Sequence, residues 1–119
     1  IVMTTDRTSK NVFYEIFKKY EIIRNEEFEN LKSINNILIL DRLNFENWIS
    51  IINSSTYVIT PECGCTHIAS LSETKLCVIY DSDNLPGMIA EEYAPWKKKY
   101  TKLFSNNQNL EKELISFID

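Results

Sequence analysis

Glycine and proline are scarce in this chain, with only two glycines and three prolines among 119 residues. This scarcity excludes collagen-like and glycine- or proline-rich low-complexity chains, whose backbones depend on these residues. Hydrophobic residues make up 44% and charged residues 25% of the sequence, which are ordinary globular values. We therefore expect one compact domain over residues 1–119, rich in regular secondary structure.

The chain also lacks an excess of basic residues, because its formal net charge is −4. Binding of nucleic acid through charge requires such an excess, so we expect no nucleic-acid partner, and any bound anion must be held by local groups. The longest basic run, Lys97-Lys98-Lys99, is short and follows Trp96. Such a patch is typical of a solvated helix face, with a phosphate or membrane contact as the alternative.

Long apolar runs are missing too. No stretch reaches the roughly 18 apolar residues of a membrane-spanning helix, and no basic segment followed by an apolar one marks a secretory leader. The cysteine count is odd, and Cys77 lies in an apolar stretch, which favours reduced thiols over a disulfide framework. We expect a cytoplasmic protein. Because the chain opens on Ile1 inside an apolar stretch, we also expect a piece of a longer protein.

Strand-like and helix-like patterns alternate along the sequence. Apolar stretches of strand length occupy residues 1–3, 37–40, 57–60 and 76–80, and shorter or mixed stretches at 21–23 and 100–104 predict a second strand and an edge strand. Helical spacing of apolar residues follows at 12–20, 26–31, 45–52, 66–72 and 110–118. Residues 81–99, with Pro86-Gly87 and Pro95, predict an irregular segment. The alternation predicts a Rossmann-like three-layer α/β/α fold with a mainly parallel sheet of about five or six strands.

The third of these helices has the clearest predicted start. Asn44 is placed as its N-cap, and Leu43 and Trp48 have the spacing of a hydrophobic staple. The apolar face that we expect to be buried consists of Phe45, Trp48, Ile49 and Ile52.

Two polar loops are predicted to meet at one edge of the sheet. In the strand order 3-2-1-4-5-6 the first and fourth strands are neighbours, and ligands bind beyond the carboxyl ends of such strands. The loop after the first strand carries Thr4, Thr5, Arg7, Thr8, Ser9 and Lys10. Hydroxyls and N–H groups hold phosphate oxygens, and Lys10 would neutralise a diphosphate. Simple capping of the following helix is the alternative.

The loop after the fourth strand contains Glu62, Gly64 and His67. Gly64 allows a positive φ and close approach of a ligand, and the next helix starts there, so the loop is a candidate pyrophosphate site. His67 would add a hydrogen bond or a charge, and Glu62 could accept from a ribose or sugar hydroxyl. The alternative is a turn with a histidine at a helix start.

Cys63 and Cys65 in the same loop, with His67 and Cys77, also suggest a metal site. Zinc sites commonly use cysteine pairs separated by two residues, whereas one residue separates this pair and Cys77 would have to leave a buried strand. We therefore expect no metal. A reactive cysteine is a further alternative, because a thiol near a helix start can have a lowered pKa, but His67 is the only identifiable base.

The chain resembles the C-terminal half of family 9 glycosyltransferases, the heptosyltransferase group. Members have an apolar strand, then the motif Asp-Thr/Ser-Gly-x-x-His-Leu-Ala-Ala, and then a second apolar strand. The corresponding sequence of this chain is VITPECGCTHIAS followed by LCVIY. Gly64, His67 and Ala69 fall on the pattern, with Ile68 for leucine. LNFENWISIINSSTYVIT resembles the family's approach to that motif, and MTTDRTSKNV its Thr-rich loop ending in Lys.

The resemblance implies one half of a two-domain GT-B enzyme of lipopolysaccharide biosynthesis. Its donor would be a nucleotide-diphosphate sugar such as ADP-heptose, its acceptor a saccharide or glycolipid, and it would need no metal or other cofactor. The general base would belong to the N-terminal GT-B domain, so the isolated domain would be inactive. The resemblance also implies a soluble enzyme or one loosely attached to the inner membrane.

The same resemblance assigns residues to the donor. Those implied to hold the diphosphate are Thr4, Thr5 and Lys10. Those implied to line the nucleotide-sugar pocket are Glu62, Cys63, Gly64 and His67, with Glu26 or Glu27 near the ribose. Lys10 and His67 would act in catalysis by stabilising the departing diphosphate.

Five positions depart from the family pattern. Glu62 replaces the motif's Asp and Cys63 its Thr or Ser, and Glu73, Lys75 and Asp81 replace a Gly, a Pro and a Gly. A thiol is a poorer hydrogen-bond donor than a hydroxyl. The replaced Asp and Thr favour an alternative function, a non-catalytic Rossmann-like nucleotide-binding or protein-interaction module derived from such an enzyme.

Overall fold

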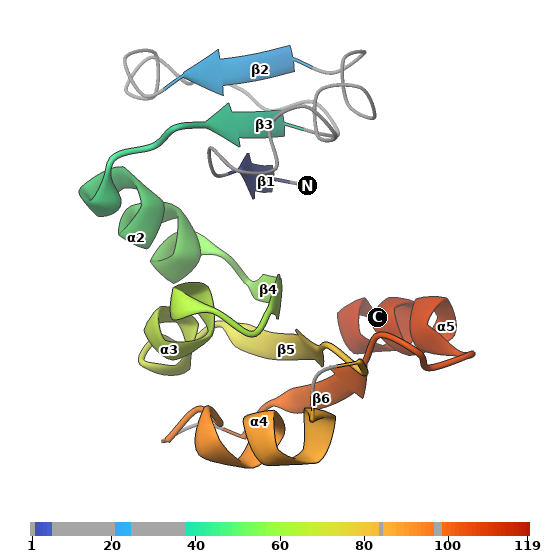
Figure 1. The fold of residues 1–119 in the computed structure, drawn as a ribbon. Coiled ribbons are helices and arrows are strands. Elements are labelled where there is room, and N and C mark those ends of the chain that lie inside the picture. Colours follow the sequence, from blue (N-terminus) through green and yellow to red (C-terminus); the bar gives the residue numbers. More distant parts are fainter. Residues whose placement is uncertain (1, 6–20, 25–37, 84, 97–98) are drawn as a thin grey trace. The chain divides into compact units, whose positions relative to one another are not determined.

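The computed structural model describes residues 2–5, 21–24, 38–83, 85–96 and 99–119 (Figure 1). In chain order, its elements are β1 (Val2–Thr5), β2 (Glu21–Arg24), β3 (Leu38–Asp41), α2 (Phe45–Ser54), β4 (Tyr57–Pro61), α3 (Gly64–Ser70), β5 (Lys75–Tyr80), α4 (Pro86–Glu92), β6 (Thr101–Phe104) and α5 (Leu110–Ile118). The chain forms two compact units, Ile1–Ile49 and Ser50–Asp119. The predicted α/β class with parallel strands is confirmed.

The first unit contains a parallel sheet in the order β1-β3-β2. Leu38 of β3 pairs with Val2 on one side and with Glu21 on the other. The predicted order placed β2 in the middle, and this was wrong. β3 holds the unbroken apolar run, which suits a strand covered on all sides, and its Leu40 is completely buried. The helices predicted at 12–20 and 26–31 lie outside the described residues.

Helix α2 starts as predicted at its N-cap. The Asn44 Oδ1 accepts a hydrogen bond from the Asn47 N–H at 2.8 Å, and the Trp48 N–H donates to the Asn44 carbonyl at 3.0 Å. Only Ile52 of the predicted apolar face is buried, whereas Phe45 is 66% exposed. Helical spacing identifies an apolar stripe but not the part of it that a neighbour covers. The Phe45 and Trp48 rings instead pack on each other, with centroids 5.9 Å apart.

The second unit contains the parallel sheet β4-β5-β6, in the predicted order. Val58 pairs with Leu76, and Val78 pairs with Lys102, so β5 is the central strand. The described strands thus form two three-stranded sheets, whereas the sequence predicts one sheet of five or six. Periodic patterns locate strands along the chain, but the pairing of strands depends on hydrogen bonds between distant segments.

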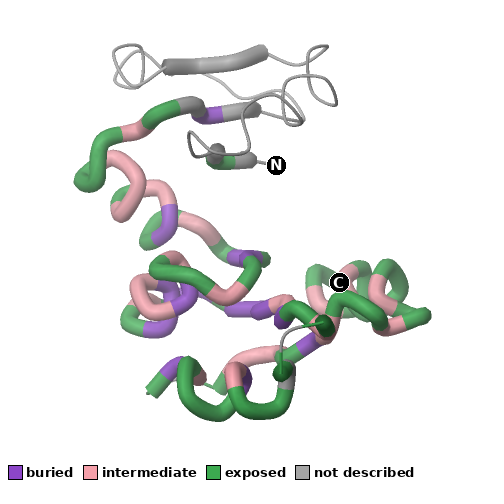
Figure 2. The backbone as a smooth tube through the Cα atoms, in the orientation of Figure 1, coloured by how far each residue is buried: buried purple, intermediate pink, exposed green. Residues whose placement is uncertain are grey.

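The core of the second unit is built around β5 (Figure 2). Its buried hydrophobic residues include Val58, Ala69, Leu76, Cys77, Val78, Tyr80, Ala90 and Leu103. Helix α3 connects β4 to β5, and α4 connects β5 to β6. Because both are crossovers between parallel neighbours, the usual right-handed connection places α3 and α4 on one face of the sheet.

Helix α4 falls in the segment predicted to be irregular. Pro86 occupies the first helical position, where the missing N–H costs nothing, and Ala90 packs into the core. The Pro86-Gly87 pair therefore marks a helix start rather than a loop. Beyond the helix, Trp96 is 90% exposed.

Helix α5 follows the predicted pattern and lies across β5 and β6 from α4 (Figure 1). The Phe117 ring meets the Tyr57 ring of β4 edge to face, with centroids 5.6 Å apart. No residue of α5 is fully buried. None of the helices in the described ranges has the length and hydrophobicity to cross a bilayer.

Candidate functional site

The candidate site is the loop between β4 and α3, at the carboxyl end of β4. Glu62 and Cys63 form this loop, because β4 ends at Pro61 and α3 begins at Gly64. The predicted strand, loop, helix and strand are all present, although α3 begins two residues before the predicted Thr66. No glycine in the described ranges has a positive φ, so Gly64 starts the helix with ordinary backbone angles.

Thr66 holds the loop closed through its side chain. This residue is completely buried. Its Oγ1 donates to the Pro61 carbonyl at 3.3 Å and accepts from the Cys63 N–H at 3.4 Å. The Thr66 N–H donates to the Cys63 carbonyl at 3.0 Å. Sequence reasoning missed this role, although Cys63 and Thr66 have the three-residue spacing of a capping box.

The Thr60 hydroxyl lies next to Cys63. Its Oγ1 is 3.4 Å from the Cys63 Sγ and donates to the Pro61 carbonyl at 3.0 Å. Burial raises the pKa of Cys65, the Thr60 hydrogen bond opposes that rise, and negative charge on Cys63 adds to it. Cys63 is exposed and Cys65 is half-buried, so the two thiols differ in their access to solvent.

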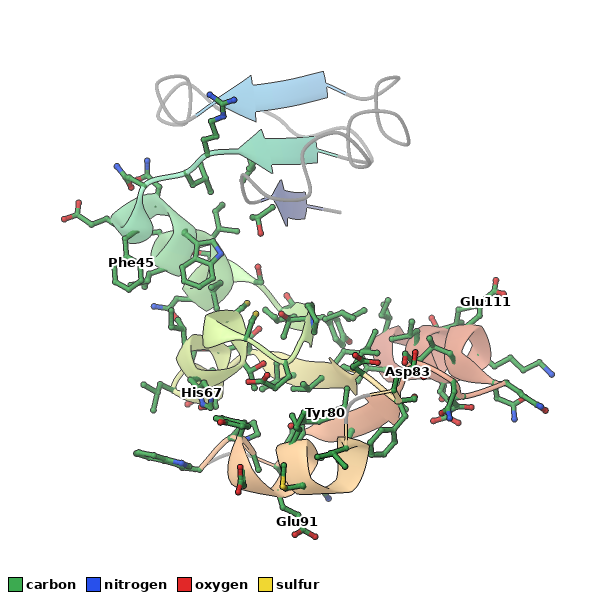
Figure 3. All side chains as sticks on the ribbon, in the orientation of Figure 1. Phe45, His67, Tyr80, Asp83, Glu91 and Glu111 are labelled. Atoms are coloured by element: carbon green, nitrogen blue, oxygen red, sulfur yellow. The ribbon has the colours of Figure 1, made fainter. Side chains whose placement is uncertain are left out.

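His67 is the fourth residue of α3 and is half-buried (Figure 3). Its backbone carbonyl accepts a hydrogen bond from the Ser70 hydroxyl at 2.7 Å, which ties it to the last turn of the helix. Within the described ranges, no three His, Cys, Asp or Glu side chains are grouped as metal ligands would be. Cys77, the fourth zinc ligand considered above, is completely buried in β5.

Glu62 acts electrostatically on Tyr80 at the end of the neighbouring strand β5. Tyr80 is completely buried, and its hydroxyl lies 3.2 Å from the hydroxyl of Tyr100. Burial raises the pKa of Tyr80, and the hydrogen bond and charge of Tyr100 and then the charge of Glu62 raise it further. The two tyrosines were not predicted as site residues. Tyr80 is the last residue of the buried apolar strand β5, and Tyr100 directly precedes β6, so their sequence signal is a polar aromatic residue at a strand boundary.

The structure therefore brings together the predicted site residues Glu62, Cys63, Gly64 and His67. Thr4 and Thr5 lie at the end of β1 in the other unit, and Thr4 is exposed. Lys10 and Glu26 lie outside the described residues. The meeting of the first loop with the loop after β4 stays a prediction.

No protein-family model, curated protein or solved structure matches this chain.

Proposed function

We propose that this chain binds a nucleotide-diphosphate sugar, of the ADP-heptose type, and serves its transfer to a saccharide or lipid-linked acceptor. One observation carries the proposal. The residues of the glycosyltransferase-like motif, Glu62, Gly64 and His67, lie in the loop and helix that follow β4, which pairs with the parallel strand β5. The carboxyl edge of parallel strands is where α/β sheets bind such ligands.

The proposed domain is one Rossmann-like half of a GT-B enzyme. In this proposal the Thr4 and Thr5 hydroxyls and the Lys10 ammonium group hold the diphosphate. Glu26 lies near the ribose in the same proposal. The enzyme acts in the cytoplasm or at the inner membrane.

Catalysis in this proposal is mainly electrostatic. As the bond to the sugar breaks, negative charge grows on the diphosphate, and Lys10 and His67 stabilise it. Glu62 orients the donor by accepting a hydrogen bond from a hydroxyl of the sugar or ribose. The N-terminal GT-B domain supplies the base that deprotonates the acceptor.

Calorimetric titration of the full chain with ADP, UDP and GDP sugars tests the donor site. We expect one of them to bind, and His67→Ala to weaken it about tenfold or more, because a hydrogen bond to a charged group is lost. Glu91→Gln, on the exposed side of α4, is the matched control and should leave the Kd unchanged. A folded protein that binds none of these sugars would exclude the donor site.

A second candidate is a nucleotide-binding module without transferase activity. It is favoured by the Cys63 thiol, which stands where the family has a hydroxyl and is turned to Thr60 at 3.4 Å. The two candidates differ once an N-terminal GT-B domain is supplied. Sugar transfer then supports the enzyme, whereas binding of the donor without any transfer supports the module.

A further inference from the structure

The thiols of Cys63 and Cys65 lie at the same helix start. Cys63 is the N-cap of α3, and Cys65 is the second residue of that helix. The Cys63 Sγ is 3.4 Å from the Thr60 Oγ1. The pKa of Cys65 responds to both Thr60 and Cys63, which agrees with this placement.

The backbone between the two cysteines also suits a link between them. Residues two apart have Cα atoms at most about 7 Å from each other, and disulfides span about 4.4 to 6.8 Å. Gly64 is the single residue between them, so the backbone can adjust without moving a side chain. Cys63 has an extended conformation, with φ −171° and ψ −174°, at the junction with α3.

The third thiol provides a contrast within the same unit. Cys77 is completely buried in the central strand β5. Burial, with the charge of Glu113, raises its pKa to about 11. A thiol in that position is kept from solvent and from the thiolate form that reacts.

We propose that Cys63 and Cys65 are a modification site, a dithiol that small-molecule disulfides such as oxidised glutathione convert reversibly to an intramolecular disulfide. The Cys63 thiolate attacks one sulfur of glutathione disulfide, whose S–S bond breaks, and one glutathione leaves as a thiolate. The Cys65 thiolate then attacks the Cys63 sulfur and releases the second glutathione. The protein loses two electrons and two protons, and the glutathione disulfide gains them.

The order of these steps follows from the burial of the two thiols. Cys63 is exposed and meets the reagent first. Cys65 is half-buried and holds its proton more tightly, so it acts second, on a sulfur brought next to it. A short ring of this kind is strained, and strained disulfides are the easily reduced ones, which suits a reversible switch rather than a structural bridge.

Oxidation would also reshape the loop. A bond to Cys65 draws the Cys63 sulfur away from Thr60 and strains the two hydrogen bonds that join the backbone of Cys63 to Thr66. Glu62, which directly precedes Cys63, would move with the backbone of Cys63. Resting on the proposed function, this predicts that the oxidised chain binds the nucleotide sugar more weakly than the reduced chain.

The disulfide is tested by mass, independently of any ligand. The full chain is equilibrated in mixtures of reduced and oxidised glutathione, quenched with acid, unfolded and alkylated. We expect oxidation to remove two of the three alkylatable thiols without retaining glutathione, and peptide mapping to join Cys63 to Cys65. Cys65→Ser should accumulate glutathione on Cys63, whereas Cys63→Ser should lose the disulfide completely.

Cys77→Ala is the matched control and should oxidise like the unsubstituted chain. Any of four results would overturn the proposal. They are a disulfide that contains Cys77, a disulfide between two chains, stable glutathione on both Cys63 and Cys65, and three free thiols at every glutathione ratio. Peptide mapping of the unsubstituted chain gives the result even if a variant fails to fold. Calorimetry on the reduced and oxidised forms tests the proposed function separately from the disulfide. A reduced chain that binds no nucleotide sugar would refute the proposed function without bearing on the proposed disulfide.

Discussion

Cys77 lies in the central strand of the second unit, with none of its surface exposed. Its neighbours Leu76 and Val78 are equally enclosed, and their side chains point to the opposite face of the sheet. A strand with buried residues on both faces tolerates a thiol there only in its neutral form, because burial opposes charge. The thiol of Cys77 thus acts as a small hydrophobic group whose ionisation opposes folding.

This leads to a prediction of stability against pH. The pKa of Cys77 is raised from 9.0 to about 11, so the unfolded chain loses this proton at lower pH than the folded chain. The stabilisation is complete below pH 9 and is lost as the pH rises to about 11. Cys77→Val should remove this dependence, on the order of 2 kcal/mol, as measured by urea unfolding across that range.

Tyr80 serves as the internal reference for that measurement. Its pKa is also raised, so its ionisation destabilises the fold at high pH in both proteins, and the difference between the two isolates Cys77. Equal losses of unfolding free energy in the two proteins would show that Cys77 does not titrate in this way.

At the scale of elements, helix α3 depends on one side chain for its start. The Thr66 hydroxyl satisfies the Cys63 N–H and the Pro61 carbonyl, both of which belong to the loop. A short helix has little internal stability, so such contacts at its end decide whether its first turn forms. The shape of the candidate site is thus coupled to a residue inside the helix.

Thr66→Val should destabilise the protein by about 1 to 3 kcal/mol, because the substitution keeps the shape of a completely buried side chain but removes the acceptor of the Cys63 N–H and one of the two hydroxyls that donate to the Pro61 carbonyl. Urea unfolding measures the loss, and hydrogen exchange at the Cys63 amide should become faster. Thr66→Ser is the matched control, since it keeps the hydroxyl. A valine variant as stable as the unsubstituted protein would show that Thr66 stabilises the fold through packing alone.

The helices and strands also show which features of the fold can be predicted from the sequence. Hydrophobic periodicity and capping residues located β4, β5, α5 and the Asn44 cap, because these depend on local spacing. Helix α4 was missed because Pro86 in the first turn of a helix has the same sequence signal as a proline in a loop. The candidate loop was predicted through Glu62 and His67, but the roles of Thr60 and Thr66 depend on contacts that form only in the folded unit.

At the scale of the whole molecule, each compact unit has its own sheet. The strands of the second unit pair with one another through β5, and their crossovers α3 and α4 belong to the same unit. Most of its buried residues likewise come from these strands and helices. Folding of the second unit therefore depends mainly on interactions within it.

A fragment of residues 43–119, which keeps the Asn44 cap, should therefore fold alone, with a helical circular dichroism spectrum and cooperative thermal unfolding. Within that fragment, Leu76→Ala should cost about 2 to 5 kcal/mol, because Leu76 is almost completely buried. Leu71→Ala, at a position that is 75% exposed, is the control and should change little. An unstructured fragment would show that the second unit needs the first.

Each of the two units contains one of the two tryptophans, and this affects how unfolding is seen by fluorescence. Trp48 belongs to the first unit and is half-buried beside Phe45, whereas Trp96 belongs to the second and is almost fully in water. The Trp96 emission therefore already resembles that of an unfolded chain, and the change in intrinsic fluorescence on unfolding comes from Trp48. The helical signal in circular dichroism includes α3, α4 and α5, all of which lie in the second unit. Melting curves that differ between fluorescence and circular dichroism would show that the two units do not unfold as one.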